Sequence, residues 1–117
     1  MDAGTAFLLR VAVAMKGARV LIQKHGPGGR ITYTDALGRT HVFEAELGGN
    51  EVLLSIYAPA APEWAARTPW PAEERGAVLE DMARRVARAE GFARHVRLSS
   101  TGVEIYERRP WWRRLWR

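Results

Sequence analysis

Two carboxylates, Glu44 and Glu46, have the spacing best suited to chemistry, two residues apart in the segment THVFEAEL. In a strand, residues two apart point to the same face of a sheet, as a general acid and base must. The same pattern arises in any strand with one face in water, and Asp35 or Glu104 could extend it into an acidic patch. We therefore predict that Glu44 and Glu46 contact a partner and are not catalytic.

Other residue types that support catalysis or ligand binding lack the required context. The histidines, His25, His41 and His95, are far apart and fit no zinc-ligand spacing. The glycine-rich stretch at 26–29 precedes a predicted strand, whereas phosphate loops precede a helix. Ser and Thr at 99–101 lie in a predicted turn, and the chain contains no cysteine. We expect no enzyme, no cofactor and no catalytic or metal-binding residue.

Two tryptophans, Trp64 and Trp70, lie in a proline-rich connection at 59–71, PAAPEWAARTPWP. The four prolines exclude regular structure throughout this stretch. Tryptophans in such a connection can seal the edge of a core, or they can form a recognition loop, since tryptophan is favoured at interface hot spots. Both interpretations stay open, and both residues are candidate partner-binding residues.

Residues 108–117, RRPWWRRLWR, are called the C-terminal segment below. Its five arginines account for the whole net charge of +5, since the other 13 Lys and Arg balance the 13 Asp and Glu. A helical wheel places the apolar residues and the arginines on separate arcs, which predicts a short amphipathic helix beginning at Pro110. About two turns are not stable alone in water. Trp112 and Trp116 therefore need a surface: their own domain, a partner or second copy, a membrane or nucleic acid.

The elements that position these residues follow from hydrophobic periodicity. Alternating patterns between glycine turns predict strands at 18–24, 31–35, 40–47, 51–58, 95–99 and 103–107. Residues 6–15 fit either a further strand or a helix. A helix is predicted at about 71–90. The order predicts an α+β fold, in which an antiparallel meander of five to seven strands packs one face against the main helix.

The predicted main helix has clear signals at both ends. Pro71 suits the first turn of the helix, and Gly91 suits the position that ends it. Five residues form its apolar stripe: Val78, Leu79, Met82, Val86 and Ala89. The pairs Glu80 with Arg84 and Asp81 with Arg85 have i,i+4 spacing, which supports a helix.

With 117 residues, the chain is long enough for one domain, which we place at 1–107, followed by the C-terminal segment. The longest apolar run, at 6–15, is interrupted by Arg10 and is shorter than a membrane span. It also lacks the positive flank and cleavage site of a secretory signal. We expect a cytoplasmic protein.

The segments ITYTDALGRTHVFEAELGGN, EVLLSIYA and PEWAARTPWPAEERGAVLEDMARRVARAEGF, followed by a closing strand, resemble small α+β immunity proteins of bacterial polymorphic toxin systems. The similarity lies in a strand meander, a loop bearing Trp and Pro, and an acidic helix start at Glu73 and Glu74. It spans roughly residues 18–106. The resemblance implies a non-enzymatic protein that binds a cognate toxin domain and blocks its active site.

The resulting functional prediction is a protein-binding module, specifically an immunity protein whose partner is a cognate toxin. The neutral body and the arginine-rich C-terminal segment depart from the acidic character of immunity proteins that act on nucleases. Homodimerisation is a further possible association. The alternative hypothesis is a peripheral membrane- or nucleic-acid-associated protein that acts through the C-terminal segment.

Overall fold

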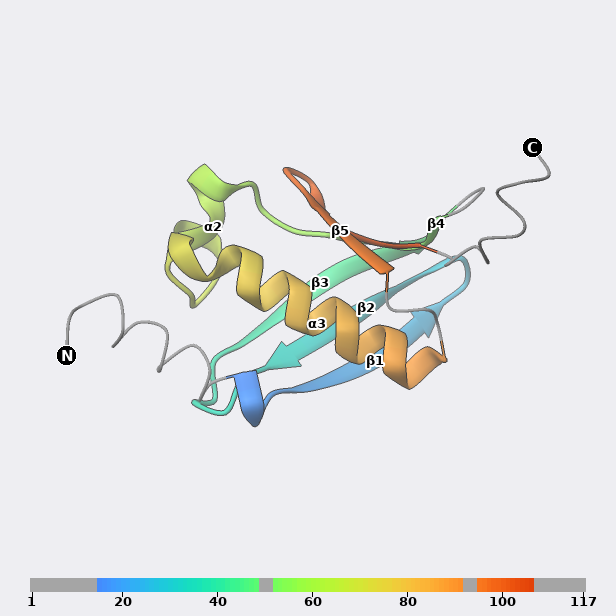
Figure 1. The fold of residues 1–117 in the computed structure, drawn as a ribbon, viewed down its shortest axis with the longest axis horizontal. Coiled ribbons are helices and arrows are strands. Elements are labelled where there is room, and N and C mark those ends of the chain that lie inside the picture. The colour runs from blue at the N-terminus through green and yellow to red at the C-terminus, as the bar shows by residue number, and fades with distance from the viewer. Residues whose placement is uncertain (1–14, 49–51, 92–94, 107–117) are drawn as a thin grey trace.

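A computed structural model describes residues 15–48, 52–91 and 95–106, in which one antiparallel sheet packs against one long helix (Figure 1). The described strands are β1 (Arg19–His25), β2 (Gly28–Thr34), β3 (Thr40–Leu47), β4 (Val52–Tyr57), β5 (His95–Ser99) and β6 (Gly102–Tyr106). Between β4 and β5 lie α2 (Ala61–Arg67), the 3₁₀ turn η1 (Ala72–Glu74) and α3 (Arg75–Glu90). The predicted α+β fold is confirmed.

The strand order is β1-β2-β3-β4-β6-β5, and all neighbours are antiparallel. The first four strands form the predicted meander. After α3, the chain adds β5 at the edge and β6 beside β4. The turn before β2 is shorter than predicted, because β2 begins at Gly28. The predicted helix at 71–90 begins with the η1 turn and continues as α3.

Two sequence predictions concern residues outside the described ranges. The amphipathic helix of the C-terminal segment lies outside them. The choice between strand and helix at 6–15 also concerns residues outside the described ranges, apart from Met15. No helix among the described residues is long and apolar enough to cross a membrane.

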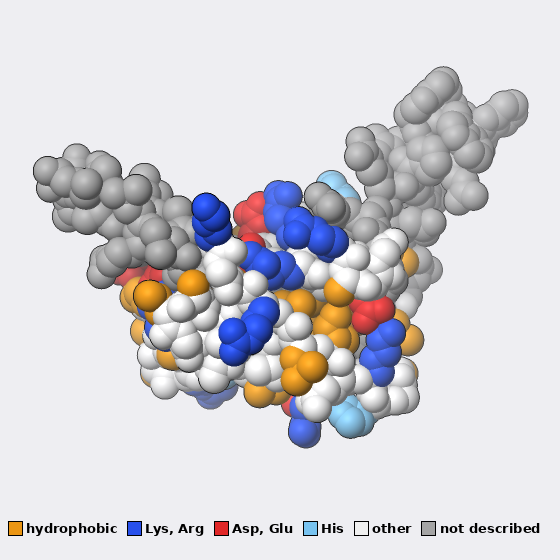
Figure 2. All heavy atoms as spheres, turned by 90° about the horizontal axis from the view of Figure 1, so that it is seen from below, with side chains coloured by type: hydrophobic (Ala, Val, Ile, Leu, Met, Phe, Trp, Pro, Cys, Tyr) orange, Lys and Arg blue, Asp and Glu red, His pale blue; other side chains and the backbone are white. Residues whose placement is uncertain are grey.

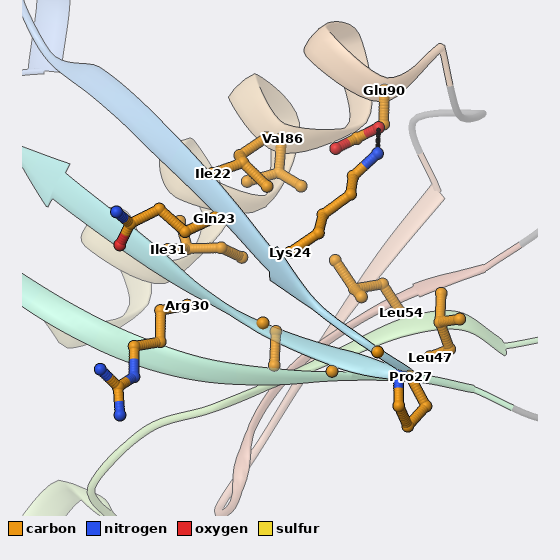
Figure 3. A pocket seen from close by; sticks show the side chains of 14 residues that line it. Ile22, Gln23, Lys24, Pro27, Arg30, Ile31, Leu47, Leu54, Val86 and Glu90 are labelled. Carbon is orange, nitrogen blue, oxygen red and sulfur yellow. Dashed lines mark hydrogen bonds and ion pairs between the residues drawn. The ribbon is translucent and has the colours of Figure 1, made fainter.

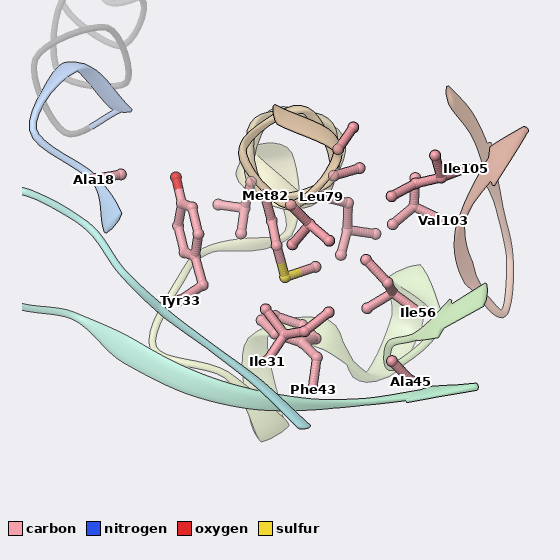
Figure 4. Packing of buried hydrophobic residues seen from close by; sticks show 14 of the residues in the cluster. Ala18, Ile31, Tyr33, Phe43, Ala45, Ile56, Leu79, Met82, Val103 and Ile105 are labelled. Atoms are coloured by element: carbon pink, nitrogen blue, oxygen red, sulfur yellow. The ribbon is translucent and has the colours of Figure 1, made fainter. Parts of the chain in front are cut away.

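The core lies between α3 and the inner face of the sheet (Figure 4). Alternate strand residues point to this face, among them Ile31, Tyr33, Phe43, Ile56 and Ile105, each at most 1% exposed. Burying side chains of this size is the main source of stability. The period-two pattern of the strands thus fixes which side faces α3.

The apolar stripe of α3 is wider than predicted on one side. Val78, Leu79, Met82 and Val86 are buried as expected, but Ala89 is exposed. Ala83 and Ala87 are buried instead. The buried arc extends toward these two alanines because small side chains let the helix approach the sheet closely, and Ala89 lies at its margin in the last turn. Gly91 ends the helix in the left-handed region, as predicted, with φ 73°.

Gly102 has a backbone conformation that other residues rarely adopt, with φ 145°. A Cβ atom at this position would overlap the carbonyl oxygen of Ile56 on β4. We expect Gly102→Ala to lower the free energy of unfolding by about 1–3 kcal/mol, because both the backbone and the β4–β6 pairing must shift. Urea denaturation measures this change.

Gly76→Ala is the matched control, because a Cβ there meets only Leu98 Cδ1 at an ordinary 3.8 Å. This replacement should raise the free energy of unfolding by about 0.4–1 kcal/mol. Equal effects of the two substitutions would contradict the structural argument.

Candidate functional site

The face of the sheet opposite α3 is not covered by any described helix, and it carries the candidate carboxylates. We call it the outer face. It is formed by alternate strand residues, chiefly Leu21, His25, Arg30, Thr32, Val42, Glu44, Glu46, Ser55, Tyr57, Arg97 and Glu104. Seen toward the β1 edge of the sheet, hydrophobic side chains lie between scattered Lys and Arg side chains (Figure 2). The surface seen from this edge is therefore mixed in character rather than uniformly charged.

Strand register arranges the outer face in rows. Leu21, Thr32 and Val42 lie opposite one another across β1, β2 and β3, and both Leu21 and Val42 are about half exposed or more. The next row on β2 and β3 contains Arg30 opposite Glu44. An apolar strip thus borders a charged one, a mixture common on surfaces that bind proteins.

Glu44 and Glu46 point to the outer face together, as their spacing predicts. Arg30 Nε lies 3.1 Å from Glu44 Oε1, and both side chains are more than half exposed. The Tyr57 hydroxyl donates a 3.2 Å hydrogen bond to Glu46 Oε2. This hydrogen bond and the negative charge of Glu46 raise the pKa of Tyr57. The carboxylates are therefore held in position by neighbours on the strands at either side.

A shallow hollow of about 370 Å³ lies over this group and is called the outer hollow. Its lining residues come from β1 to β4: His25, Gly28, Gly29, Arg30, Glu44, Ala45, Glu46 and Tyr57. Gly28 lies between His25 and Glu46 in the register, so the absence of its side chain leaves the space. A second depression shares Glu44 and Tyr57 and extends to Glu63 and Arg67 of α2.

Sequence reasoning did not identify His25, Arg30 or Tyr57 as members of this site. The turn at 48–50 could have indicated this site, because a hairpin at that turn brings β4 beside β3. Alternation along β4 then places Tyr57 on the same face as the two glutamates. What could not be inferred was the length of the turn, which sets the register.

The other histidines lie away from the outer hollow. His41 packs on the rings of Phe43 and Trp70, and its burial lowers its pKa. The ring of His95 packs on that of Tyr106. Within the described residues, no cluster of three or more His, Asp or Glu side chains could hold a metal ion.

Trp64 and Trp70 do not form a recognition loop, so the partner-binding role predicted for them is wrong. They are 0% and 1% exposed. The short helix α2 turns Trp64 inward, where its ring stacks on those of Trp70 at 5.8 Å and Phe43 at 6.2 Å. The alternative interpretation, that they seal the edge of the core, agrees with this packing. Trp112 and Trp116 lie outside the described residues.

Asp35 does not extend the acidic patch, because it is 1% exposed. Its carboxylate accepts hydrogen bonds from Trp70 Nε1 at 2.9 Å, Arg39 Nε at 2.7 Å and the backbone N–H groups of Leu37 and Arg39. Burial alone would raise the pKa of Asp35, but these hydrogen bonds and the charge of Arg39 outweigh it and lower the pKa. Asp35 therefore has a structural role and joins the β2–β3 turn to the tryptophan cluster.

Searches against protein-family models, curated proteins and solved structures found no match to this chain.

Proposed function

We propose that the protein is a non-catalytic binding module that docks through its outer face on a partner protein. The outer hollow supports this proposal. In it, two carboxylates, an arginine and a tyrosine lie on a sheet face that no described helix covers. A rigid sheet presents these side chains without a large ordering cost on binding.

The chemistry of the outer hollow favours a partner that offers basic side chains. Glu44 and Glu46 both have exposed carboxylates, and each is oriented by a neighbour rather than enclosed. A lysine or arginine that enters the hollow would meet two carboxylates and could pack its stem on Tyr57. The apolar row of Leu21 and Val42 would lie beside it and supply contact area.

The particular partner that we propose is the cognate toxin of a bacterial polymorphic toxin system. The sequence resemblance to immunity proteins supports this choice. Such a protein would meet its toxin in the cytoplasm and block the toxin's active site. Basic residues around that active site would suit the carboxylates of the outer hollow.

The test is binding to the toxin encoded by the neighbouring gene, measured by co-purification and calorimetry. Glu44→Arg and Glu46→Arg should each weaken binding by roughly thirtyfold, since interface hot spots are worth about 2 kcal/mol. Added salt should also weaken the complex.

Glu80→Arg is the matched control, because Glu80 is a half-exposed glutamate that is also paired with an arginine, 2.7 Å from Arg84 on α3. It should leave binding unchanged. Absence of any complex with the unmodified protein at micromolar concentration would overturn the toxin proposal. Binding to anionic vesicles or DNA that is lost on deleting residues 108–117 would instead support the alternative function through the C-terminal segment.

A further inference from the structure

A second recess lies on the inner side of the sheet and is called the inner cavity (Figure 3). Its volume is about 210 Å³, and it opens between the β1–β2 hairpin, the neighbouring ends of β3 and β4, and the last turns of α3. Its walls are largely apolar: Ile22, Ile31, Ala45, Leu47, Leu54 and Val86. The ion pair between Lys24 Nζ and Glu90 Oε2, at 2.9 Å, spans one side.

The inner cavity exists because two residues on the inner face of the sheet have little or no side chain. Gly29 and Ala45 lie opposite each other in the β2–β3 register. A Cβ at Gly29 would lie 2.6 Å from the backbone oxygen of Gln23, so no larger residue fits there. The sheet therefore offers little side-chain volume beneath Val86, which leaves a local gap between the last turns of α3 and this part of the sheet.

Leu47 marks the open side of the inner cavity. Alternation along β3 gives it the same face as Phe43 and Ala45, yet it is 62% exposed. Its pairing partner Leu54 is only half-buried. No described residue covers this apolar mouth, so the mouth is suited to a segment with large apolar side chains.

The last described strand, β6, ends beside this mouth. Ile105 pairs with Leu54, and Tyr106, the last residue of β6, pairs with Val52. Neighbouring strands are about 5 Å apart. Trp112 follows Tyr106 by six residues, which can span up to about 20 Å when extended. The connection is therefore long enough to bring a tryptophan over the mouth.

The size of the inner cavity matches one aromatic side chain. A dry cavity of about 150 Å³ accepts benzene in another protein, so about 210 Å³ can receive the larger indole ring. On the helical wheel of the C-terminal segment, Trp112 lies within the apolar arc, between Trp116 and Leu115.

We propose that the C-terminal segment docks on its own domain and that the Trp112 indole fills the inner cavity. The arginines on the opposite arc of the wheel then face water. This docking uses the inner side of the sheet, so it is independent of the proposed partner contact on the outer face.

The test uses the full chain labelled with 5-fluorotryptophan and fluorine NMR, with the Trp112 resonance assigned from Trp112→Phe. In the unmodified protein this resonance should be shifted from its position in the denatured chain. Leu47→Asp should remove that shift, because a carboxylate at the mouth would be desolvated by the indole. Leu47→Ser serves as a second variant, and neither change removes a buried side chain.

Leu21→Asp is the matched control, because Leu21 is also a strand leucine, 59% exposed, but on the outer face. It should leave the Trp112 shift in place. A Trp112 resonance at the denatured position in the unmodified protein, or one unaffected by Leu47→Asp, would overturn the proposal. A Trp112 shift that disappears on dilution would show that the segment of a second copy fills the cavity. A Trp112 shift that appears only with anionic vesicles or DNA would show that the segment binds elsewhere. Either result would also overturn the proposal.

Discussion

Replacing Asp35 by alanine should lower the free energy of unfolding by about 3–5 kcal/mol, because it leaves buried donors without their acceptor. Arg39 and the indole N–H of Trp70 both lose a charged partner. Arg39 retains only two longer contacts, of 3.4 and 3.5 Å, to the buried Glu74. Urea denaturation at neutral pH measures the change.

The control is Glu80→Ala, which removes one exposed i,i+4 ion pair on α3. It should cost only about 0.3–0.5 kcal/mol. A cost for Asp35→Ala within that range would show that the buried carboxylate contributes no more than a surface charge.

The contribution of Asp35 should also depend on pH. Its pKa is lowered in the folded state, so the stabilisation is fully present above the unfolded pKa of about 3.9 and is lost as pH falls through the folded value. The stability difference between the unmodified protein and Asp35→Asn should be constant from about pH 5 to 7 and shrink below about pH 4. Denaturation curves across this range measure the difference. A difference that grows on acidification would contradict the assigned direction.

Replacing Trp70 by alanine should lower the free energy of unfolding by about 3–5 kcal/mol, the usual cost of removing a fully buried large aromatic side chain. The ring contacts Tyr33, Phe43 and Trp64, with centroid distances of 5.8–6.4 Å. Its loss would open a cavity at the centre of the aromatic cluster. Chemical denaturation with two independent probes, circular dichroism and fluorescence, measures the loss.

Phenylalanine substitutions separate the polar part of this effect from the apolar part. Trp70 donates a hydrogen bond to Asp35, whereas the buried Nε1 of Trp64 has no hydrogen-bond partner among the described residues. Trp70→Phe should therefore cost about 1.5–3 kcal/mol more than Trp64→Phe, the value of a hydrogen bond to a charged group. Equal costs would mean that the bond to Asp35 contributes nothing net.

The order of the elements could be inferred from the sequence because each has a strong local signal. Alternation in residues 40–47 predicts β3, and the Gly91 stop predicts the end of α3 within a residue. These signals depend on neighbours in the chain and on the two faces of an element. The common face of Glu44 and Glu46 was predictable for the same reason.

The packing of the tryptophans could not be inferred in this way. Whether Trp64 and Trp70 face a partner or the core depends on how α2 and the following turn return to Phe43, and no local pattern encodes that path. The burial of Asp35 has the same cause, since its carboxylate meets Trp70 from 35 residues away. The two hollows likewise arise from glycines set opposite particular neighbours, which requires the register of the sheet.

The place of β6 between β4 and β5 has a consequence for how the chain folds. The hairpins of β1 to β4 pair residues close in sequence, but Ile56 of β4 pairs with Val103 of β6, across the whole helical region. Such a non-local pairing forms late, because a long loop must close first. Val103 and Ile105 belong to the buried core, so during synthesis the core closes only after β6 has left the ribosome. Until then β4 has an unpaired edge, whose free backbone N–H and C=O groups can pair with another chain and promote aggregation.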